Sequence, residues 1–141
     1  MDLHCQNSIK FRVRYSETDQ MGYCYYGNYA AFLEMGRVEC LRMIGIVYSE
    51  LEQMGILLPV KSLEINYLLP AKYDNLLTLT TQLVKLNNAS LEFHYEIWNE
   101  SNVKITEAKT TLVFVSTPQL KPMRTPGWIV EKLKVYEIIE R

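Results

Sequence analysis

One loop near the start of the chain combines carboxylates, aromatic side chains and glycines. It reads YSETDQMGYCYYGNY from Tyr15 to Tyr29, and its carboxylates are Glu17 and Asp19. Asn28 is a favoured residue type at a helix N-cap, and the residues after it repeat with a helical period. A helix start presents unpaired N–H groups and a partial positive charge, which suit an anion or a polarised carbonyl. A carboxylate folded back over it supplies a base or nucleophile, so the pair fits ester or thioester hydrolysis.

The helix that follows this loop is predicted from Asn28 to Ile44, with Gly45 as its C-cap. Its polar side is expected to carry two i,i+3 ion pairs, Glu34–Arg37 and Glu39–Arg42. Its apolar positions form one wide face: Tyr29, Phe32, Leu33, Gly36, Cys40, Leu41 and Ile44.

The elements that position the loop are strands with a period of two residues. We expect strands at 9–15, 57–67, 76–86, 91–97 and 103–116, and a closing helix at 128–140. That helix has Thr125 as its predicted N-cap and Pro126 at its first position. The order indicates an α+β fold in a single domain, residues 1–141. Its antiparallel five-stranded sheet is wrapped around one long central helix and followed by a short C-terminal helix.

Composition excludes several classes of protein. A formal net charge of −1 and a pI of about 6.1 give no attraction to nucleic acid. The three cysteines and two histidines show no metal-ligand spacing, so no metal is expected. The first ten residues lack the apolar core of a signal peptide, and no apolar run reaches the length of a membrane span. Because unpaired cysteines suit a reducing compartment, we expect a cytoplasmic protein.

Several short motifs occur in a recognisable order. They are the Thr18-Asp19 pair, Gly22, the YYGNY approach to the helix, FLE followed by Arg37, and LEINYLLPA at 63–71. In this order, from Ile9 to Pro126, the chain resembles the 4-hydroxybenzoyl-CoA thioesterase family of hotdog-fold proteins, including its short-chain acyl-CoA members. The resemblance implies a hotdog fold and hydrolysis of an acyl-CoA or aroyl-CoA to the free acid, without a cofactor.

The resemblance also implies roles for residues of the loop. Asp19 is the expected general base or nucleophile toward the thioester carbonyl. The oxyanion donor falls on the backbone N–H of Tyr26, and Gly27 allows close approach of the chain. Some members carry a histidine where this chain has Tyr26, so a proton shuttle through that histidine is in doubt here.

Substrate contacts are predicted less specifically. Tyr25, Asn28 and Tyr29 are the candidate substrate contacts of the loop, and Tyr23, Tyr25 and Tyr29 are each either core or pocket-lining residues. Lys61, Lys72, Lys121 and Arg124 are candidate contacts for the CoA phosphates. Glu17 is expected to be solvated, and His94, on the polar face of its strand, to be structural or to face solvent.

Three other functions remain open from sequence. The substrate carrier is either CoA or acyl carrier protein, and a non-catalytic acyl-CoA-binding protein is the alternative from another class. A hotdog dehydratase needs a catalytic histidine, and neither His4 nor His94 lies near the helix start. Because one helix cannot cover a sheet of this size, we expect a homo-oligomer, either a dimer or a homotetramer of paired dimers.

Overall fold

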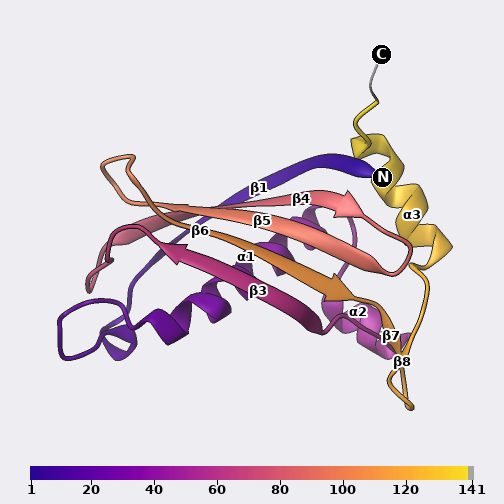
Figure 1. Ribbon diagram of the computed structural model, residues 1–141, viewed down its shortest axis with the longest axis horizontal. Coiled ribbons are helices and arrows are strands. Elements are labelled where there is room, and N and C mark those ends of the chain that lie inside the picture. Colours follow the sequence, from indigo (N-terminus) through magenta and orange to yellow (C-terminus); the bar gives the residue numbers. More distant parts are fainter. Residues whose placement is uncertain (140–141) are drawn as a thin grey trace.

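The computed structural model describes residues 1–139, and its main element is an antiparallel sheet of five strands (Figure 1). The order across the sheet is β1-β4-β5-β6-β3, so the hairpin-connected β4, β5 and β6 lie between two edge strands. The bounds of the strands are Asp2–Arg12 for β1, Val60–Tyr67 for β3, Leu76–Leu86 for β4, Ser90–Trp98 for β5 and Lys104–Val113 for β6.

Helix α1 (Tyr29–Met43) packs on the inner face of this sheet, mainly against β1 and β4. The central strands bury every second side chain on that face, as their alternating sequences predict. The inner-face residues of β4, β5 and β6 include Leu77, Leu79, Thr81, Leu83, Leu91, Phe93, Tyr95, Ile97, Thr106, Ala108, Thr110 and Leu112. The predicted sheet around one long helix is therefore confirmed.

Several predicted boundaries were wrong. Strand β1 starts at Asp2 instead of Ile9, and Tyr15 lies in a 3-10 turn instead of the strand. A short helix, α2 (Tyr48–Gln53), was not predicted. The expected strand 57–67 is divided into β2 (Ile56–Leu57) and β3, because Leu58 and Pro59 interrupt it.

The C-terminal part also differs from prediction. A second, small sheet has the order β2-β7-β8, where β7 is Val115–Ser116 and β8 is Lys121–Pro122. Helix α3 (Gly127–Leu133) is shorter than the predicted helix 128–140, of which residue 140 lies outside the described residues. Pro126, not Thr125, occupies its N-cap, and the Thr125 hydroxyl donates to the Asn87 carbonyl instead.

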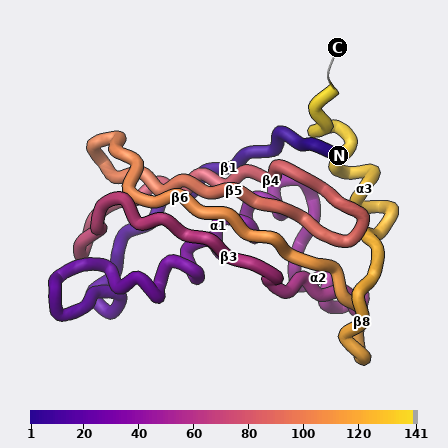
Figure 2. Tube along the Cα trace, viewed as in Figure 1, coloured from indigo at the N-terminus to yellow at the C-terminus, as the bar shows by residue number. Residues whose placement is uncertain are grey.

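The course of the backbone is simplest to follow as a tube (Figure 2), which shows the 15–28 loop projecting from one end of the molecule and α3 at the other. Cys5, Cys24 and Cys40 are buried free thiols. No helix of the described part is both long and apolar enough to cross a membrane.

Candidate active site

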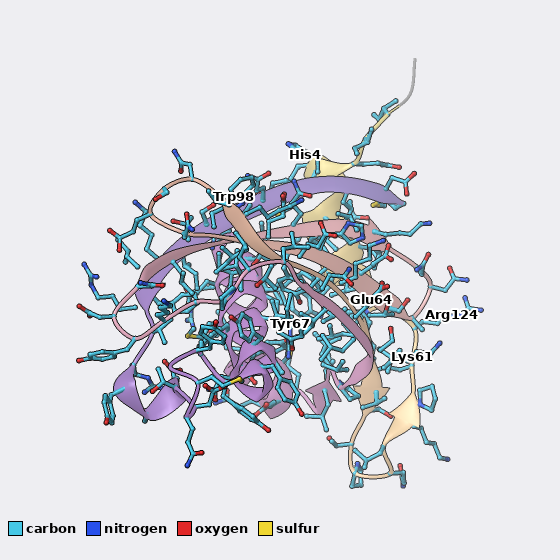
Figure 3. All side chains as sticks on the ribbon, turned by 60° about the vertical axis from the view of Figure 1, so that its left-hand side comes forward. His4, Lys61, Glu64, Tyr67, Trp98 and Arg124 are labelled. Atoms are coloured by element: carbon cyan, nitrogen blue, oxygen red, sulfur yellow. The ribbon has the colours of Figure 1, made fainter. Side chains whose placement is uncertain are left out.

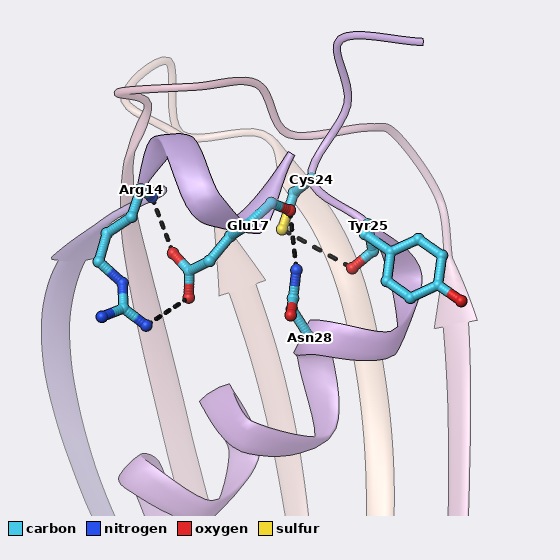
Figure 4. Close-up of polar contacts among 5 residues, drawn as sticks. All are labelled: Arg14, Glu17, Cys24, Tyr25 and Asn28. Atoms are coloured by element: carbon cyan, nitrogen blue, oxygen red, sulfur yellow. Dashed lines mark hydrogen bonds and ion pairs between the residues drawn. The ribbon is translucent and has the colours of Figure 1, made fainter. Parts of the chain in front are cut away.

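Glu17 closes the loop that precedes α1 (Figure 4). Its carboxylate accepts the backbone N–H of Arg14 at 2.7 Å and lies 3.2 Å from the Arg14 guanidinium. Its backbone carbonyl accepts the N–H of Tyr25 at 2.8 Å and the side-chain amide of Asn28 at 2.7 Å. Glu17 is 8% exposed, so the expectation of a solvated carboxylate was wrong. These four contacts fold the loop back onto the start of the helix.

Asp19 sits at the tip of a tight hairpin within this loop. Its N–H donates to the Tyr23 carbonyl, and its carbonyl accepts the Gly22 N–H. Its carboxylate Oδ1 accepts the N–H groups of Met21 at 2.9 Å and Tyr23 at 3.2 Å. Gly22 has φ +80°, in the left-handed region that glycine enters without strain. A carboxylate with two N–H donors on one oxygen is held in a single orientation, and Oδ2 accepts no hydrogen bond within the described part of the chain.

The start of the helix carries unpaired N–H groups. Within residues 1–139 neither the Tyr26 nor the Gly27 N–H donates a hydrogen bond, and both precede α1 in a 3-10 turn (Tyr26–Asn28). A Cβ atom at Gly27 would lie 2.6 Å from the Tyr25 ring, so a larger residue there would displace that largely exposed ring. Asn28 is the N-cap by position, but its side chain donates to Glu17 and forms no cap bond.

Aromatic side chains surround this helix start. The Tyr67 hydroxyl, at the end of β3, donates to the Tyr26 carbonyl at 3.1 Å, and its ring lies 5.0 Å from that of Tyr29. Tyr29 is buried, whereas Tyr25 and Tyr26 are largely exposed. Burial, followed by the neighbouring Cys24 and Tyr67, raises the pKa of Tyr29, so this phenol stays neutral and does not act as a base.

A cleft of about 690 Å³ opens beside Asp19, lined by other loop residues and by Tyr73. Sequence reasoning missed Tyr73, which comes from the turn between β3 and β4 and meets Tyr15 at a ring-centroid distance of 5.5 Å. Its signal was weak, because a single tyrosine in a turn has no periodic pattern. Among the described residues, no group of three or more side chains is arranged to hold a metal ion.

Three of the four predicted CoA-binding cations are not brought together with Asp19. Figure 1 shows β3 running toward the loop from the end where β7 and β8 lie, and Lys61 is near its start. Lys121 is in β8 and Arg124 follows it, and Figure 3 shows Lys61 and Arg124 on the same side of the molecule. Lys72, by contrast, lies next to the loop, because its backbone forms an isolated β-bridge with that of Tyr23.

Two further expectations concerned the polar side of α1, and one of them was wrong. Glu39 and Arg42 form the predicted ion pair at 3.3 Å. Arg37 is buried and has no carboxylate within 4.0 Å among residues 1–139, while Glu34 is exposed. The missed signal was position: Arg37 falls between the buried Leu33 and Leu41, four residues from each on the same helix face. His94 is partly exposed on the outer face of β5, as predicted, 3.8 Å from Glu92.

Comparisons with known proteins agree with this architecture. The family model described as "Thioesterase superfamily" matches residues 21–106. A putative acyl-CoA thioesterase, YneP, of Bacillus subtilis is 31% identical over 123 residues, covering 84% of this chain and 89% of its own. The acyl-CoA thioester hydrolase YbgC of Escherichia coli O6:H1 is 32% identical over 123 residues, covering 87% and 92%.

Solved structures give the same result. The DHNA-CoA thioesterase of Staphylococcus aureus superposes with a TM-score of 0.87 at 31% identity, over 92% of this chain and 90% of that one. A 4-hydroxybenzoyl-CoA thioesterase variant crystallised with 4-hydroxybenzoyl-CoA has a TM-score of 0.83 over 92% of this chain and 99% of its own, but at 17% identity it supports the fold alone. From the matched family model, the relatives and the shared architecture together, we conclude that this chain belongs to the thioesterase superfamily.

Proposed function

We propose that this protein hydrolyses the thioester of an acyl-CoA or aroyl-CoA to the free acid and CoA. The observation that carries the proposal is that one folded loop holds both an oriented carboxylate, Asp19, and two N–H groups without acceptors, those of Tyr26 and Gly27. Family membership supplies the thioester, and CoA is the carrier in the names of the similar YneP and YbgC proteins and of the Staphylococcus aureus structure. Residues 1–141 form, on this proposal, a single domain in the cytoplasm.

The loop supplies the two requirements of this reaction. Asp19 either removes a proton from the attacking water or attacks the carbonyl carbon itself and is later released by water. In both cases the carbonyl π electrons move onto oxygen, and the N–H of Tyr26 donates a hydrogen bond to that oxyanion. Collapse of the tetrahedral intermediate breaks the C–S bond, and the CoA thiolate leaves and takes up a proton. A backbone donor needs no particular side chain, so the absence of histidine at this position is compatible with the proposal.

We further propose that the protein acts as a homodimer, and that two dimers pair as a homotetramer. Strand β3 is the last strand of the sheet and presents exposed apolar residues, which is the typical property of a strand that pairs with another chain. The exposed apolar residues of β3 and the turn after it are Val60, Leu63, Tyr67, Leu68 and Leu69. Antiparallel pairing of two β3 strands would put the start of one, with Lys61, beside the end of the other, with Tyr67. Lys61 of one copy would then lie beside the candidate active site of the other.

The substitution Asp19→Asn tests this proposal. The asparagine Oδ1 accepts the same two N–H groups, so the hairpin is retained while the base or nucleophile is lost. We expect kcat for acyl-CoA hydrolysis to fall at least ~100-fold. The assay measures the release of the CoA thiol. A panel of aliphatic and aromatic acyl-CoAs, with acyl carrier protein thioesters beside it, identifies the substrate.

Asp74→Asn is the matched control. Asp74 is exposed in the neighbouring turn with φ 66°, a conformation that asparagine also tolerates. This variant should keep wild-type activity. A near wild-type kcat for Asp19→Asn would show that Asp19 is neither the general base nor the nucleophile.

A further inference from the structure

Arg37 is a buried cation without a charged partner. It is 8% exposed, and its Nε–H has no hydrogen-bond acceptor within the described residues. None of their carboxylates lies within 4.0 Å of it. A buried charge without a counter-charge is costly, and an unmet guanidinium donor adds to that cost. Such a residue needs an explanation outside the packing of the chain.

The groups around Arg37 are neutral. Its guanidinium lies near the hydroxyls of Tyr48, at the start of α2, and Tyr95, on β5. Burial raises the pKa of both phenols, while the positive charge of Arg37 opposes that rise. Tyr95 also shares a 2.6 Å hydrogen bond with Thr110. Phenols that remain protonated orient the guanidinium without compensating its charge.

Arg37 also lines an open groove of about 520 Å³ between α1, α2 and the segment leading into β3. The walls include apolar residues such as Val38, Leu57 and Leu58. The groove contains a second cation, Arg42, but Glu39 pairs with it. Glu34 and Glu52 also line the groove, and both are exposed to solvent. A buried, unpaired arginine therefore meets a partly apolar groove that is large enough for a ligand.

We propose that Arg37 binds a carboxylate at the far end of the acyl group, so that the preferred substrates are CoA thioesters of dicarboxylic acids. The inference rests on the proposed thioesterase function and specifies its substrate class. A planar guanidinium fits a carboxylate with two parallel charge-assisted hydrogen bonds. The anion would compensate the buried charge and accept the unmet Nε–H, and the apolar walls would contact the methylene chain.

The strands indicate how far apart the helix start and Arg37 lie. The Tyr26 N–H is at the level of Tyr67, which bonds the Tyr26 carbonyl. The Arg37 guanidinium lies near the Tyr95 hydroxyl, which bonds Thr110, and Thr110 pairs with Leu63 of β3. Arg37 is therefore near the level of Leu63. Tyr67 and Leu63 are four residues apart on one face of β3, which is about 13 Å at ~3.3 Å per residue.

An acyl group that reaches from the helix start to Arg37 therefore needs several methylene groups between the thioester and the carboxylate. The exposed apolar side chains of Leu63 and Tyr67 lie on this face of β3.

The test compares each dicarboxylic acyl-CoA, from succinyl to sebacoyl, with its neutral monomethyl ester. For the wild type we expect kcat/KM to favour the free carboxylate by roughly 10- to 100-fold at the longer chain lengths of this series, which is the range of a charge-assisted hydrogen bond. Arg37→Met should abolish this preference and Arg37→Lys should keep part of it. Arg42→Met, which removes the paired cation of the same groove, should leave it unchanged. A purely structural role for Arg37 would lower activity on both substrates equally and would overturn the inference.

A binding measurement separates this inference from the proposed function. In the thioether analogue of a long dicarboxylic acyl-CoA of this series the thioester carbonyl is replaced by CH₂, so it binds but is not hydrolysed. Calorimetric titration should show tighter binding of this analogue than of its methyl ester to the wild type, and equal binding of the two to Arg37→Met. Equal binding by the wild type would refute the carboxylate subsite, even if neutral acyl-CoAs are hydrolysed. Discrimination without hydrolysis of any thioester would support the subsite and refute the thioesterase proposal.

Discussion

Helix α1 passes closely over β4 at Gly36, and substitution of this glycine by alanine has two opposing effects on stability. A Cβ atom there would overlap the Thr81 hydroxyl and lie 2.8 Å from a Leu79 methyl group. Alanine is better than glycine in a helix interior by about 1 kcal/mol. Overpacking costs about 1–3 kcal/mol, and with two β4 side chains displaced we expect the upper part of that range. The free energy of unfolding of Gly36→Ala should therefore decrease by ~1–2 kcal/mol.

Thermal unfolding at a fixed protein concentration measures this effect. For a chain of this size, ~1–2 kcal/mol lowers Tm by about 3–6 °C. Thr81→Ala tests the cause, because it removes the hydroxyl that the introduced methyl group would meet, and that hydroxyl has no hydrogen-bond partner within residues 1–139. Each single substitution should destabilise, and the double variant should be more stable than the sum of the two by ~1–2 kcal/mol.

Gly127→Ala is the control for a glycine with free space, since a Cβ atom there meets nothing within 4 Å. Its Tm should stay at or above the wild-type value. A Gly36→Ala protein that unfolds at or above the wild-type temperature would show that the helix can move away from β4 without cost. Strictly additive effects of Gly36→Ala and Thr81→Ala would refute the contact as the cause.

Three other predictions concern the loop and the edge of the sheet. Tyr26→Phe should change kcat less than about threefold, because the proposed donor is the backbone N–H, and a loss as large as that of Asp19→Asn would assign chemistry to the phenol. Light scattering at micromolar concentration should give a multiple of the 16.5 kDa chain mass, and Leu63→Asp, which places a charge on the exposed β3 strand, should shift it toward 16.5 kDa. Burial first, and then the charge of Glu17, raises the pKa of Cys24 to about 11, so iodoacetamide should label it far more slowly at pH 8 in the folded than in the urea-unfolded protein. Since its folded pKa lies above the unfolded value near 9, the stability contributed by the neutral thiol is complete below pH 9 and is lost as the pH rises through 11.

The strongly periodic parts of the sequence were predicted well. The apolar face of α1 and the alternating β4 and β5 specified a sheet against one helix, because burial imposes one period on each element. Short or polar elements were not predictable in this way. Strand β1 begins early because Leu3 and Cys5 are buried, but the polar Gln6, Asn7 and Ser8 conceal the alternation. Helix α2 has six residues, too few for a helical period to be recognised.

The candidate site was predictable as a segment but not as a set of contacts. Placing Asp19, Tyr26 and Gly27 in one loop required only that they are neighbours in sequence. The buried Glu17 was missed because its partners are the N–H and guanidinium of Arg14, and the sequence does not show that the chain turns back there. Arg37 was assigned to the solvent side of α1 by its charge, although its spacing from the buried Leu33 and Leu41 placed it inward.

The two edges of the main sheet have a consequence for assembly. Near the start of β1, the Ile138 N–H donates to the Asp2 carbonyl at 2.9 Å, and Leu3 bridges to Glu137, so the chain covers part of that edge itself. Farther along the same strand, Lys10 and Arg12 are exposed, and their charges oppose the approach of an identical strand. Strand β3 is the other edge of the sheet, and its exposed charged residues, Lys61 and Glu64, have opposite signs, so they do not repel an antiparallel copy as the cations of β1 do. Strand addition at β3 would therefore consume the open edge of both copies and leave only protected edges outside, which limits growth by strand addition to two chains and keeps the protein from forming fibres.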